Sequence, residues 1–165
     1  MLPRPTAAAS NGCCCKGMAT PATGCELCAT AGGELLWQSE RCRVVRVDDA
    51  DYPGFCRVIW NRHVREMTDL PTDERQELMA VVFAVESVVR KFFSPDKINL
   101  ASLGNMTPHV HWHIIPRWQT DKHFPQPIWG TPQRGGKSDS LVVVSSQDLR
   151  NALAEALATV EVEKK

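Results

Sequence analysis

The stretch from Pro108 to Arg117 constrains the fold of this chain more than any other, because two kinds of side chain alternate along it. Three of the five histidines of the sequence stand here at every second position, with apolar residues between them. A period of two is typical of a β-strand, in which successive side chains point to opposite faces. We therefore expect the histidines to share one face, about 6.5–7 Å apart from one to the next. They are His109, His111 and His113, and the residues expected to face the core are Val110, Trp112 and Ile114.

A row of histidines limits the chemistry of that face. Near pH 7 a neutral imidazole can act as a nucleophile, carry a proton or bind a metal. A metallo-β-lactamase type of site requires an aspartate where Trp112 stands, and a cupin type of site requires a glutamate soon after its histidine pair. The first acidic residue after His113 is Asp121, so the sequence fits neither of these metal sites.

The pattern of three histidines separated by single apolar residues resembles the histidine triad (HIT) family of nucleotide hydrolases and transferases. The resemblance runs from about Cys25 to Trp129. It includes Tyr52-Pro53-Gly54-Phe55, Asn61-Arg62-His63, Asn99, Gly104-Asn105 and Ile115-Pro116-Arg117. The family forms homodimers whose sheets join across the two-fold axis, so the resemblance implies a homodimer.

The composition excludes several classes of protein. The chain is 43% hydrophobic with a formal net charge of +0, which suits a domain with its own core and gives no electrostatic reason to bind a nucleic acid or a membrane surface. No run of about 18 apolar residues is present to span a bilayer, and residues 1–20 lack the apolar region of a secretory signal. Seven cysteines make an odd number, which favours reduced thiols or metal ligands over disulfides and predicts a cytoplasmic protein.

The remaining periodicity predicts an α+β domain, in which an antiparallel sheet carries one long helix on a face and a C-terminal helix follows. The long helix covers 73–93, with Thr72 as its N-cap and a valine-rich stripe at helical spacing. Prolines argue against a central strand at 123–129, which we expect to be an extended tail lying across the domain. The other predicted strands are 34–38, 41–47, 55–60 and 97–103, and the second helix is 147–162.

The same patterns divide the chain into segments. Residues 1–23 are rich in Pro, Ala, Thr, Ser and Gly, and we expect a disordered N-terminal extension there. Residues 24–131 form the HIT-like domain, and residues 132–165 form a linker and a C-terminal segment with the second helix.

The resemblance implies roles for the triad. His111, the middle histidine, corresponds to the family's nucleophile, which attacks the α-phosphorus of a nucleotide and forms a nucleotidyl-histidine intermediate. Such covalent catalysis replaces one difficult displacement by two easier ones, and a stiff strand positions an imidazole well for it. His113 is the candidate contact to the phosphate oxygens.

Polar residues near the triad are candidates to bind the nucleotide and its phosphates. The turn before the triad strand can offer backbone N–H groups and side chains to an anion, and its candidate residues are Gly104, Asn105 and Thr107. Asn99 matches a polar position that the family places near the phosphate and ribose, although a sheet asparagine with local hydrogen bonds explains it equally well. Asp48 resembles the family's partner of the ribose hydroxyls, and Asp49 is a close rival.

One position departs from the family. Members commonly carry a fourth histidine directly after the Pro-Gly type of turn, and here that residue is Phe55. The fourth histidine usually supports the phosphate and the leaving group. The substitution leaves protonation of the leaving group without an assigned residue.

A second set of residues resembles a metal site. Some HIT proteins combine a C-x-x-C pair near the N-terminus with a histidine after the third strand and the first triad histidine, and together these bind a structural Zn²⁺. The corresponding residues here are Cys25, Cys28, His63 and His109. Two thiols and two imidazoles make a closed tetrahedral set, so His109 would face the metal and take no part in catalysis. Thiols packed without a metal remain the alternative.

The resemblance thus implies a nucleotide hydrolase or transferase that cleaves at the α-phosphate of a nucleotidyl substrate. The substrate would be a purine nucleotide derivative, either a dinucleoside polyphosphate or a nucleoside phosphoramidate. The alternative, favoured by Phe55, is a nucleotide-binding, zinc-stabilised adaptor protein with little or no turnover.

Overall fold

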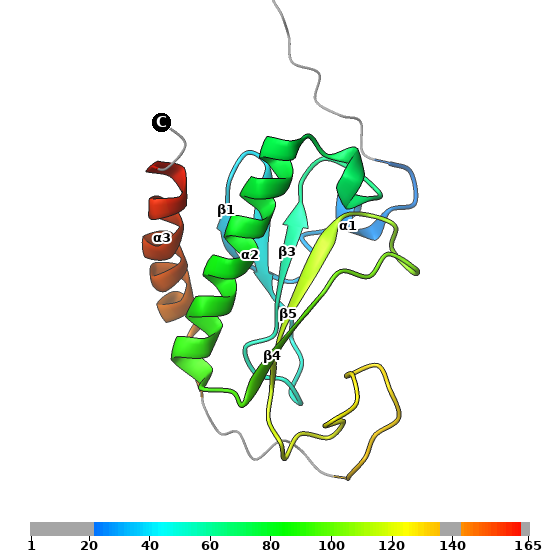
Figure 1. Ribbon diagram of the computed structural model, residues 1–165, viewed down its shortest axis with the longest axis vertical. Helices are drawn as coiled ribbons and strands as arrows, with labels where there is room; N and C mark the ends of the chain where they lie inside the picture. The colour runs from blue at the N-terminus through cyan, green and yellow to red at the C-terminus, as the bar shows by residue number, and fades with distance from the viewer. Residues whose placement is uncertain (1–21, 136–142, 163–165) are drawn as a thin grey trace, which may run out of the picture.

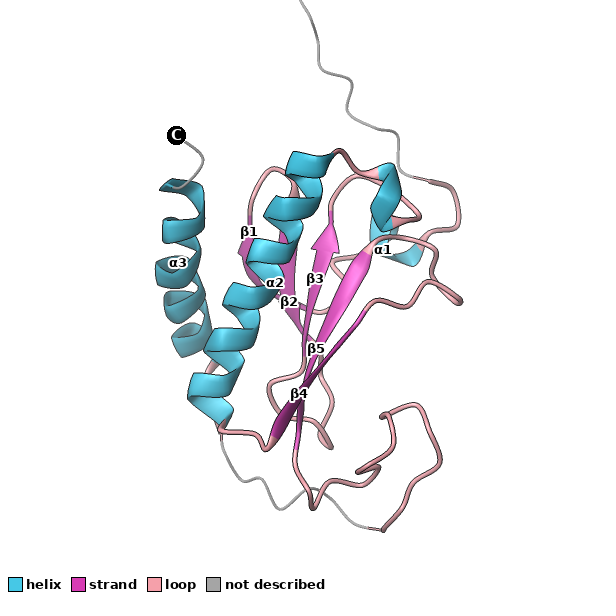
Figure 2. Cartoon of the chain, in the orientation of Figure 1, coloured by secondary structure: helices cyan, strands magenta, loops and turns pink. Residues whose placement is uncertain are grey.

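The computed structural model describes residues 22–135 and 143–162, and these contain one antiparallel sheet with helices packed on it (Figure 1). The spatial order of the strands is β1-β2-β3-β5-β4. The strands are β1 (Glu34–Gln38), β2 (Cys42–Arg46), β3 (Cys56–Trp60), β4 (Lys97–Ala101) and β5 (His111–Arg117). The helices are α1 (Glu26–Ala29), α2 (Thr72–Phe93), α3 (Ser146–Val162) and a single 3-10 turn, η1 (Met67–Asp69). The α+β architecture, the antiparallel pairing and the long helix are as predicted (Figure 2).

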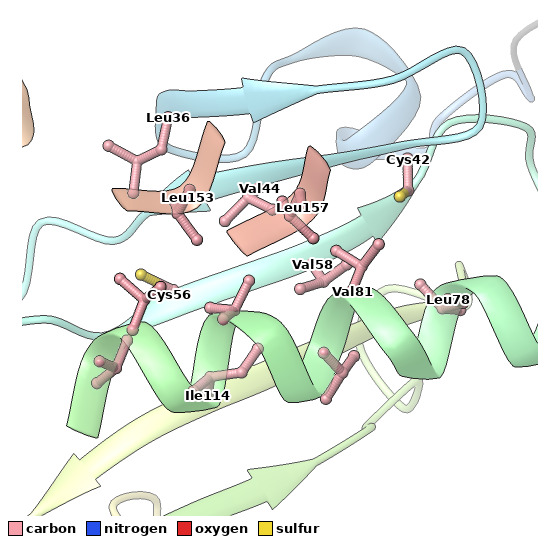
Figure 3. Close-up of a cluster of buried hydrophobic side chains, with 14 of the residues drawn as sticks. Leu36, Cys42, Val44, Cys56, Val58, Leu78, Val81, Ile114, Leu153 and Leu157 are labelled. Atoms are coloured by element: carbon pink, nitrogen blue, oxygen red, sulfur yellow. The ribbon is translucent and has the colours of Figure 1, made fainter. Parts of the chain in front are cut away.

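Helix α2 covers one face of the sheet because its apolar residues recur at helical spacing and line a single stripe. Leu78, Val81 and Val85 are buried against β3 and β5 in the main core. Helix α3 packs beside α2 and over β1, and places Leu153 and Leu157 in the same core (Figure 3). Burying a side chain of this size stabilises a fold by roughly 1.5–3 kcal/mol, so both helices fix the sheet from this side.

The ends of α2 differ in part from the prediction. Thr72 is the first residue of the helix and Pro71 holds the N-cap position, without a side-chain capping bond, so the predicted N-cap is wrong by one residue. Proline is tolerated there because the first N–H groups of a helix have no partner within it. At the other end Ser94 adopts a left-handed conformation with φ 43° and donates its N–H to Arg90 O, which ends the helix at the predicted place.

The triad strand is shorter at its start than the pattern suggests. Strand β5 begins at His111, and the backbone N–H of His109 donates to Thr107 O within the preceding loop. Val110, Trp112 and Ile114 pack toward α2 as predicted. The expected extended tail at 123–129 is wrong, because the chain runs there through successive turns that are held by the Asp121 carboxylate.

The sheet face opposite α2 carries the histidines, and its register defines what lies beside them. His111 pairs with Ile59 of β3, and His113 pairs with Arg57. On the other side of β5, Ala101 of β4 pairs with His113. Trp129, from the turns after β5, contacts His113 on this face, and Cys25, directly before α1, contacts His109.

In the part of the chain that the structure describes, no helix combines the length and apolar character needed to cross a bilayer. The cysteines at 13–15 lie outside the described residues, as do most of the residues of the predicted N-terminal extension.

Candidate active site and metal centre

The ring of His111 is held in one orientation by its own strand. Its Nδ1 lies 2.6 Å from the carbonyl oxygen of His109, and a carbonyl only accepts, so Nδ1 carries the proton and donates it. Nε2 then keeps its lone pair and points away from that bond. Burial lowers the pKa of His111, which keeps the ring neutral near pH 7. Ser102 Oγ donates to the carbonyl oxygen of His111 across 2.8 Å, so the backbone at this candidate nucleophile is also held by the residue that follows β4.

His113 lies in an aromatic enclosure. Its ring centroid is 4.8 Å from that of His111, 5.7 Å from that of Phe55 and 5.1 Å from that of Trp129. Burial, together with the charges of His111 and Arg57, lowers the pKa of His113 to about 3. Its Nδ1 is buried without a hydrogen-bond partner among the described residues. His113 is therefore a neutral ring with an unused polar atom beside the nucleophile candidate.

The four predicted metal ligands come together at the end of the sheet where β5 begins. Their donor atoms all lie within 4.8 Å of one another. Nδ1 of His109 is 3.3 Å from the Cys25 thiol and 3.5 Å from the Cys28 thiol, and Nδ1 of His63 is 3.5 Å from Cys28. A tetrahedral zinc ion with bonds of about 2.0–2.3 Å has ligand atoms roughly 3.3–3.8 Å apart. The residues present therefore fit a metal ion of this kind.

The surroundings of the metal ligands support the same interpretation. His109 Nε2 lies 2.6 Å from the carbonyl oxygen of Trp60, so Nε2 carries the proton and Nδ1 presents its lone pair to the thiols. Arg43 donates to the carbonyl oxygens of Leu27, Thr30 and Ala31. These bonds hold α1 and the residues after it against β2, and so fix the C-x-x-C segment in place.

The residues predicted to bind phosphate or ribose lie in three separate places: the loop before β5, strand β4 and the loop after β2. Gly104 and Asn105 line a cavity together with His109, in the loop that leads into β5, and Thr107 is not among the residues that line it. The Asn99 side chain accepts a hydrogen bond of 2.7 Å from Arg117, as the local interpretation of that residue expected. Asp48 is exposed in the loop after β2.

A separate cavity contains Asp48. The residues that line it include Gly33, Arg46, Asp49 and Gly54, and no triad histidine is among them. Asp49 accepts a hydrogen bond from the backbone N–H of Asp51, which stabilises the loop. Neither aspartate therefore shares a cavity lining with His111 or His113.

Two residues of the histidine face were missed by the sequence interpretation. Arg57 pairs with His113 across β3 and β5, and Trp129 lies against the same ring. The period of two in 55–60 places Arg57 on the face opposite Val58, and only the register of β3 with β5 brings it to the triad. Trp129 carries no local signal, because its position depends on the turns that follow β5.

The turns after β5, which carry Trp129, are anchored by a buried ion pair between Arg117 and Asp121. Arg117 donates to both carboxylate oxygens of Asp121 at 2.7 Å and 3.0 Å, and also to Gln126 O. His123 forms a hydrogen bond with the Tyr52 hydroxyl. Arg117 and the backbone N–H groups of residues 123 and 124 lower the pKa of Asp121, against the effect of its burial. The network holds the segment that carries Trp129 against the triad.

Comparison with known proteins agrees with this geometry. The HIT domain family model matches residues 31–120. Over 74 residues the chain is 38% identical to a bis(5'-nucleosyl)-tetraphosphatase [asymmetrical] of Schizosaccharomyces pombe, which covers 42% of this chain and 41% of that protein. Over 85 residues it is 32% identical to an AP-4-A phosphorylase of Mycobacterium tuberculosis, with 48% and 44% covered. The chain thus matches less than half the length of these curated relatives.

Solved structures show the same fold over most of the chain. A histidine triad protein from Marinobacter aquaeolei VT8 superposes with a TM-score of 0.62 at 29% identity, covering 81% of this chain and 94% of that one. A histidine triad protein from Bradyrhizobium japonicum gives a TM-score of 0.59 at 28% identity, covering 74% and 90%.

Proposed function

This chain belongs to the HIT domain family, and we propose that it is a nucleotide hydrolase or transferase that cleaves its substrate at the α-phosphate through a nucleotidyl-His111 intermediate. The observation that carries the proposal is the bond from His111 Nδ1 to the carbonyl oxygen of His109. It leaves Nε2 as the lone-pair nitrogen of a neutral ring on a rigid strand, which is what a nucleophilic imidazole requires.

In the first step the Nε2 lone pair of His111 attacks the α-phosphorus. The N–P bond forms while the bond from phosphorus to the leaving group breaks, and the leaving group departs with the electron pair. The carbonyl oxygen of His109 stabilises the positive charge that develops on the imidazole, because Nδ1 keeps its proton and its bond to that oxygen. His113 Nδ1, which has no partner among the described residues, faces the phosphate oxygens.

In the second step water attacks the same phosphorus, the N–P bond breaks and His111 recovers its lone pair. The nucleoside monophosphate and the proton from water are then released. In a transferase, an acceptor such as inorganic phosphate replaces the water. The curated relatives are named for reactions of both kinds, a tetraphosphatase and a phosphorylase, and they support a dinucleoside polyphosphate as substrate.

We propose that Cys25, Cys28, His63 and His109 hold a structural Zn²⁺. These residues would join α1 and the residue before it to the loop after β3 and to the loop before β5, and they would supply all four ligands that a structural zinc requires. Zinc is chosen over other metals because two thiolates and two imidazoles at tetrahedral spacing suit it best. Elemental analysis of protein purified without added metal tests the proposal, and we expect about one zinc per chain.

A homodimer and a cytoplasmic location complete the proposal. β1 and β4 are the edge strands of the sheet, and an edge strand is where two sheets can join. Cys25, Cys28 and Cys56 are free thiols, which agrees with a reducing compartment. Light scattering during size-exclusion chromatography measures the mass of the assembly, and a mass of one chain would contradict the dimer.

Mass spectrometry of the quenched reaction tests the enzyme directly. During turnover of diadenosine tetraphosphate we expect a peptide that carries an adenylate on His111. The contact between Phe55 and His113 is the observation that favours the rival function, a nucleotide-binding adaptor. Binding of AMP without any turnover or adduct would support the adaptor and contradict the enzyme.

A further inference from the structure

Arginines occupy three positions on the histidine face, one on each of three strands. Arg43 belongs to β2 and pairs with Ile59, Arg57 belongs to β3 and pairs with His113, and Arg117 ends β5. A guanidinium group has five N–H donors and always carries its charge. The partners of each group therefore show whether it serves the fold or has donors left for a ligand.

Two of the three are committed to the protein. Arg43 uses all of its nitrogens, on three carbonyl oxygens and on the Asn61 side chain. Arg117 makes a bidentate pair with Asp121 and also donates to Asn99 and Gln126. Both groups hold segments of the chain together, and the structure accounts for their donors.

Arg57 is different. Its Nη1 donates to the carbonyl oxygen of Gly32 across a long 3.4 Å. Its Nε is buried without a hydrogen-bond partner in the part of the chain that the structure describes, as is Nδ1 of the neighbouring His113. No carboxylate of the described residues forms an ion pair with Arg57. The guanidinium lies 5.8 Å from the centroid of the Phe55 ring, which holds it by a cation–π contact and offers it no counter-charge.

We propose that Arg57 forms an anion subsite beside His113, which binds the phosphate group next to the α-phosphate and stabilises it as it is released. This inference rests on the function proposed above. His111 and His113 take the α-phosphate, and Arg57 stands one strand away from His113 on the same face, a spacing of about 4.8 Å. Its reach therefore extends to the adjoining phosphate of the substrate.

The chemistry of a guanidinium makes the subsite selective. When the P–O bond of a polyphosphate breaks, the electron pair stays on the released phosphate oxygen, and a fixed positive charge stabilises that oxygen without transferring a proton. When the P–N bond of a phosphoramidate breaks, the released amine must take up a proton. Arg57 cannot supply it, because an arginine does not deprotonate in proteins. The subsite therefore favours dinucleoside polyphosphates over phosphoramidates.

Steady-state kinetics of Arg57→Gln on two substrates tests this. For diadenosine tetraphosphate we expect kcat/KM to fall by about 10²–10³-fold, as for the loss of one group that stabilises developing charge. For an adenosine phosphoramidate with an amine leaving group we expect a fall of less than about 10-fold. An equal fall for both substrates would indicate a structural role for Arg57 and overturn the subsite. Arg90→Gln removes an exposed arginine of α2, on the other side of the sheet, and is the matched control for charge.

Binding of inorganic tripolyphosphate separates the subsite from the proposed reaction. We expect Arg57→Gln to weaken this binding by about 10- to 100-fold in calorimetry, as for the loss of a hydrogen bond to a charged group. If Arg57→Gln does not fold, Arg57→Lys keeps the charge but loses the fork of donors, and we expect it to bind tripolyphosphate more weakly than the wild type. Unchanged binding would overturn the proposal. A wild type that binds tripolyphosphate through Arg57 but cleaves neither substrate would contradict the enzyme and leave the subsite supported.

Discussion

His109 and His111 stand two residues apart on one face, yet their surroundings make them different chemical groups. The ring of His109 is engaged at both nitrogens, with a carbonyl oxygen at Nε2 and two thiols at Nδ1. Among the described residues, the ring nitrogen of His111 with a hydrogen-bond partner is Nδ1. An imidazole with both nitrogens occupied can stabilise a structure, and one with a free lone pair can attack a substrate.

The regions around His109 and His111 differ in the same way as the two rings, in whether their polar atoms already have partners. The proposed metal site has all four of its donors from the protein. The triad region contains buried nitrogens without partners among the described residues, on His113 and Arg57, which is typical of a site that a ligand completes. The carbonyl of His109 connects the two regions, because it belongs to a residue of the proposed metal site and accepts the bond that orients His111.

Replacing His111 tests the contrast with the largest expected effect. We expect His111→Ala to lower kcat for diadenosine tetraphosphate on the order of 10⁴-fold or more, as for the loss of a covalent nucleophile. Zinc content and melting temperature should change little, because His111 is not a ligand of the metal centre. Equal rates for wild type and variant would contradict the role of His111, and loss of zinc would show that the two regions are one.

Replacing a thiol of the proposed metal site should have the opposite effect to His111→Ala: a large change in zinc content and melting temperature, and a smaller change in turnover. We expect Cys28→Ser to lose zinc and to lower the melting temperature by about 8–16 °C, since a metal at 1,000 times its Kd contributes about 4 kcal/mol and each kcal/mol corresponds to about 2–4 °C in a domain of this size. The protein that remains folded should turn over about 10- to 100-fold more slowly, because the carbonyl of His109 is no longer fixed.

Cys56→Ala is the matched control for the metal centre, because Cys56 is a buried thiol of the main core. It should keep about one zinc per chain while losing some stability to the cavity that it leaves. A Cys28→Ser protein with full zinc content would contradict the ligand set. A zinc-free protein with unchanged turnover would show that the two regions are independent.

The parts of this structure that follow a local pattern could be predicted from the sequence. The valine stripe indicated α2, and the alternation of histidines indicated β5 and the side on which Val110, Trp112 and Ile114 pack. The grouping of Cys25, Cys28, His63 and His109 was predictable because the resemblance to the family supplied four positions that are distant in sequence. Spacing within C-x-x-C alone would have left His63 unassigned.

The parts that depend on register or on tertiary bonds could not be predicted. Arg57 meets His113 only because β3 and β5 pair in one particular register. Prolines correctly argued against a strand at 123–129, but the turns found there depend on the bonds of Asp121 to Arg117 and to backbone N–H groups. Those bonds bring Trp129 to the triad, and no local signal in the sequence marks them.

The pH dependence of the free energy of unfolding separates the triad region from the proposed metal site by a smaller effect than the substitutions above. The pKa of His113 is about 3 in the folded protein, against a usual value of 6.5, so the unfolded chain binds more protons between these values and the free energy of unfolding falls as the pH falls below about 6.5. Each such proton gives a slope of at most about 1.4 kcal/mol per pH unit. The groups that face His113 are His111, Arg57 and two aromatic rings.

We therefore expect His113→Phe to lose stability less steeply than the wild type from about pH 7 to pH 5, in denaturant titrations of zinc-saturated protein. Burial also lowers the pKa of His109 and His111, so both proteins should keep part of the slope, and the difference between them isolates His113. Parallel curves would show that His113 is accessible to protons in the folded state.

The smallest expected effect concerns Ser102, which tests how closely the backbone at His111 must be held. Its hydroxyl donates to the carbonyl oxygen of His111 across 2.8 Å, and one such bond contributes about 0.5–1.5 kcal/mol. Ser102→Ala should lower the melting temperature by about 1–6 °C and kcat/KM by less than about 10-fold, without loss of zinc. Ser87→Ala, which removes an exposed serine that bonds within α2, should change neither activity nor zinc content. If Ser102→Ala lowered activity as far as His111→Ala does, the orientation of His111 would depend on Ser102 more than on the carbonyl of His109, and the link between the two regions would have to be placed there.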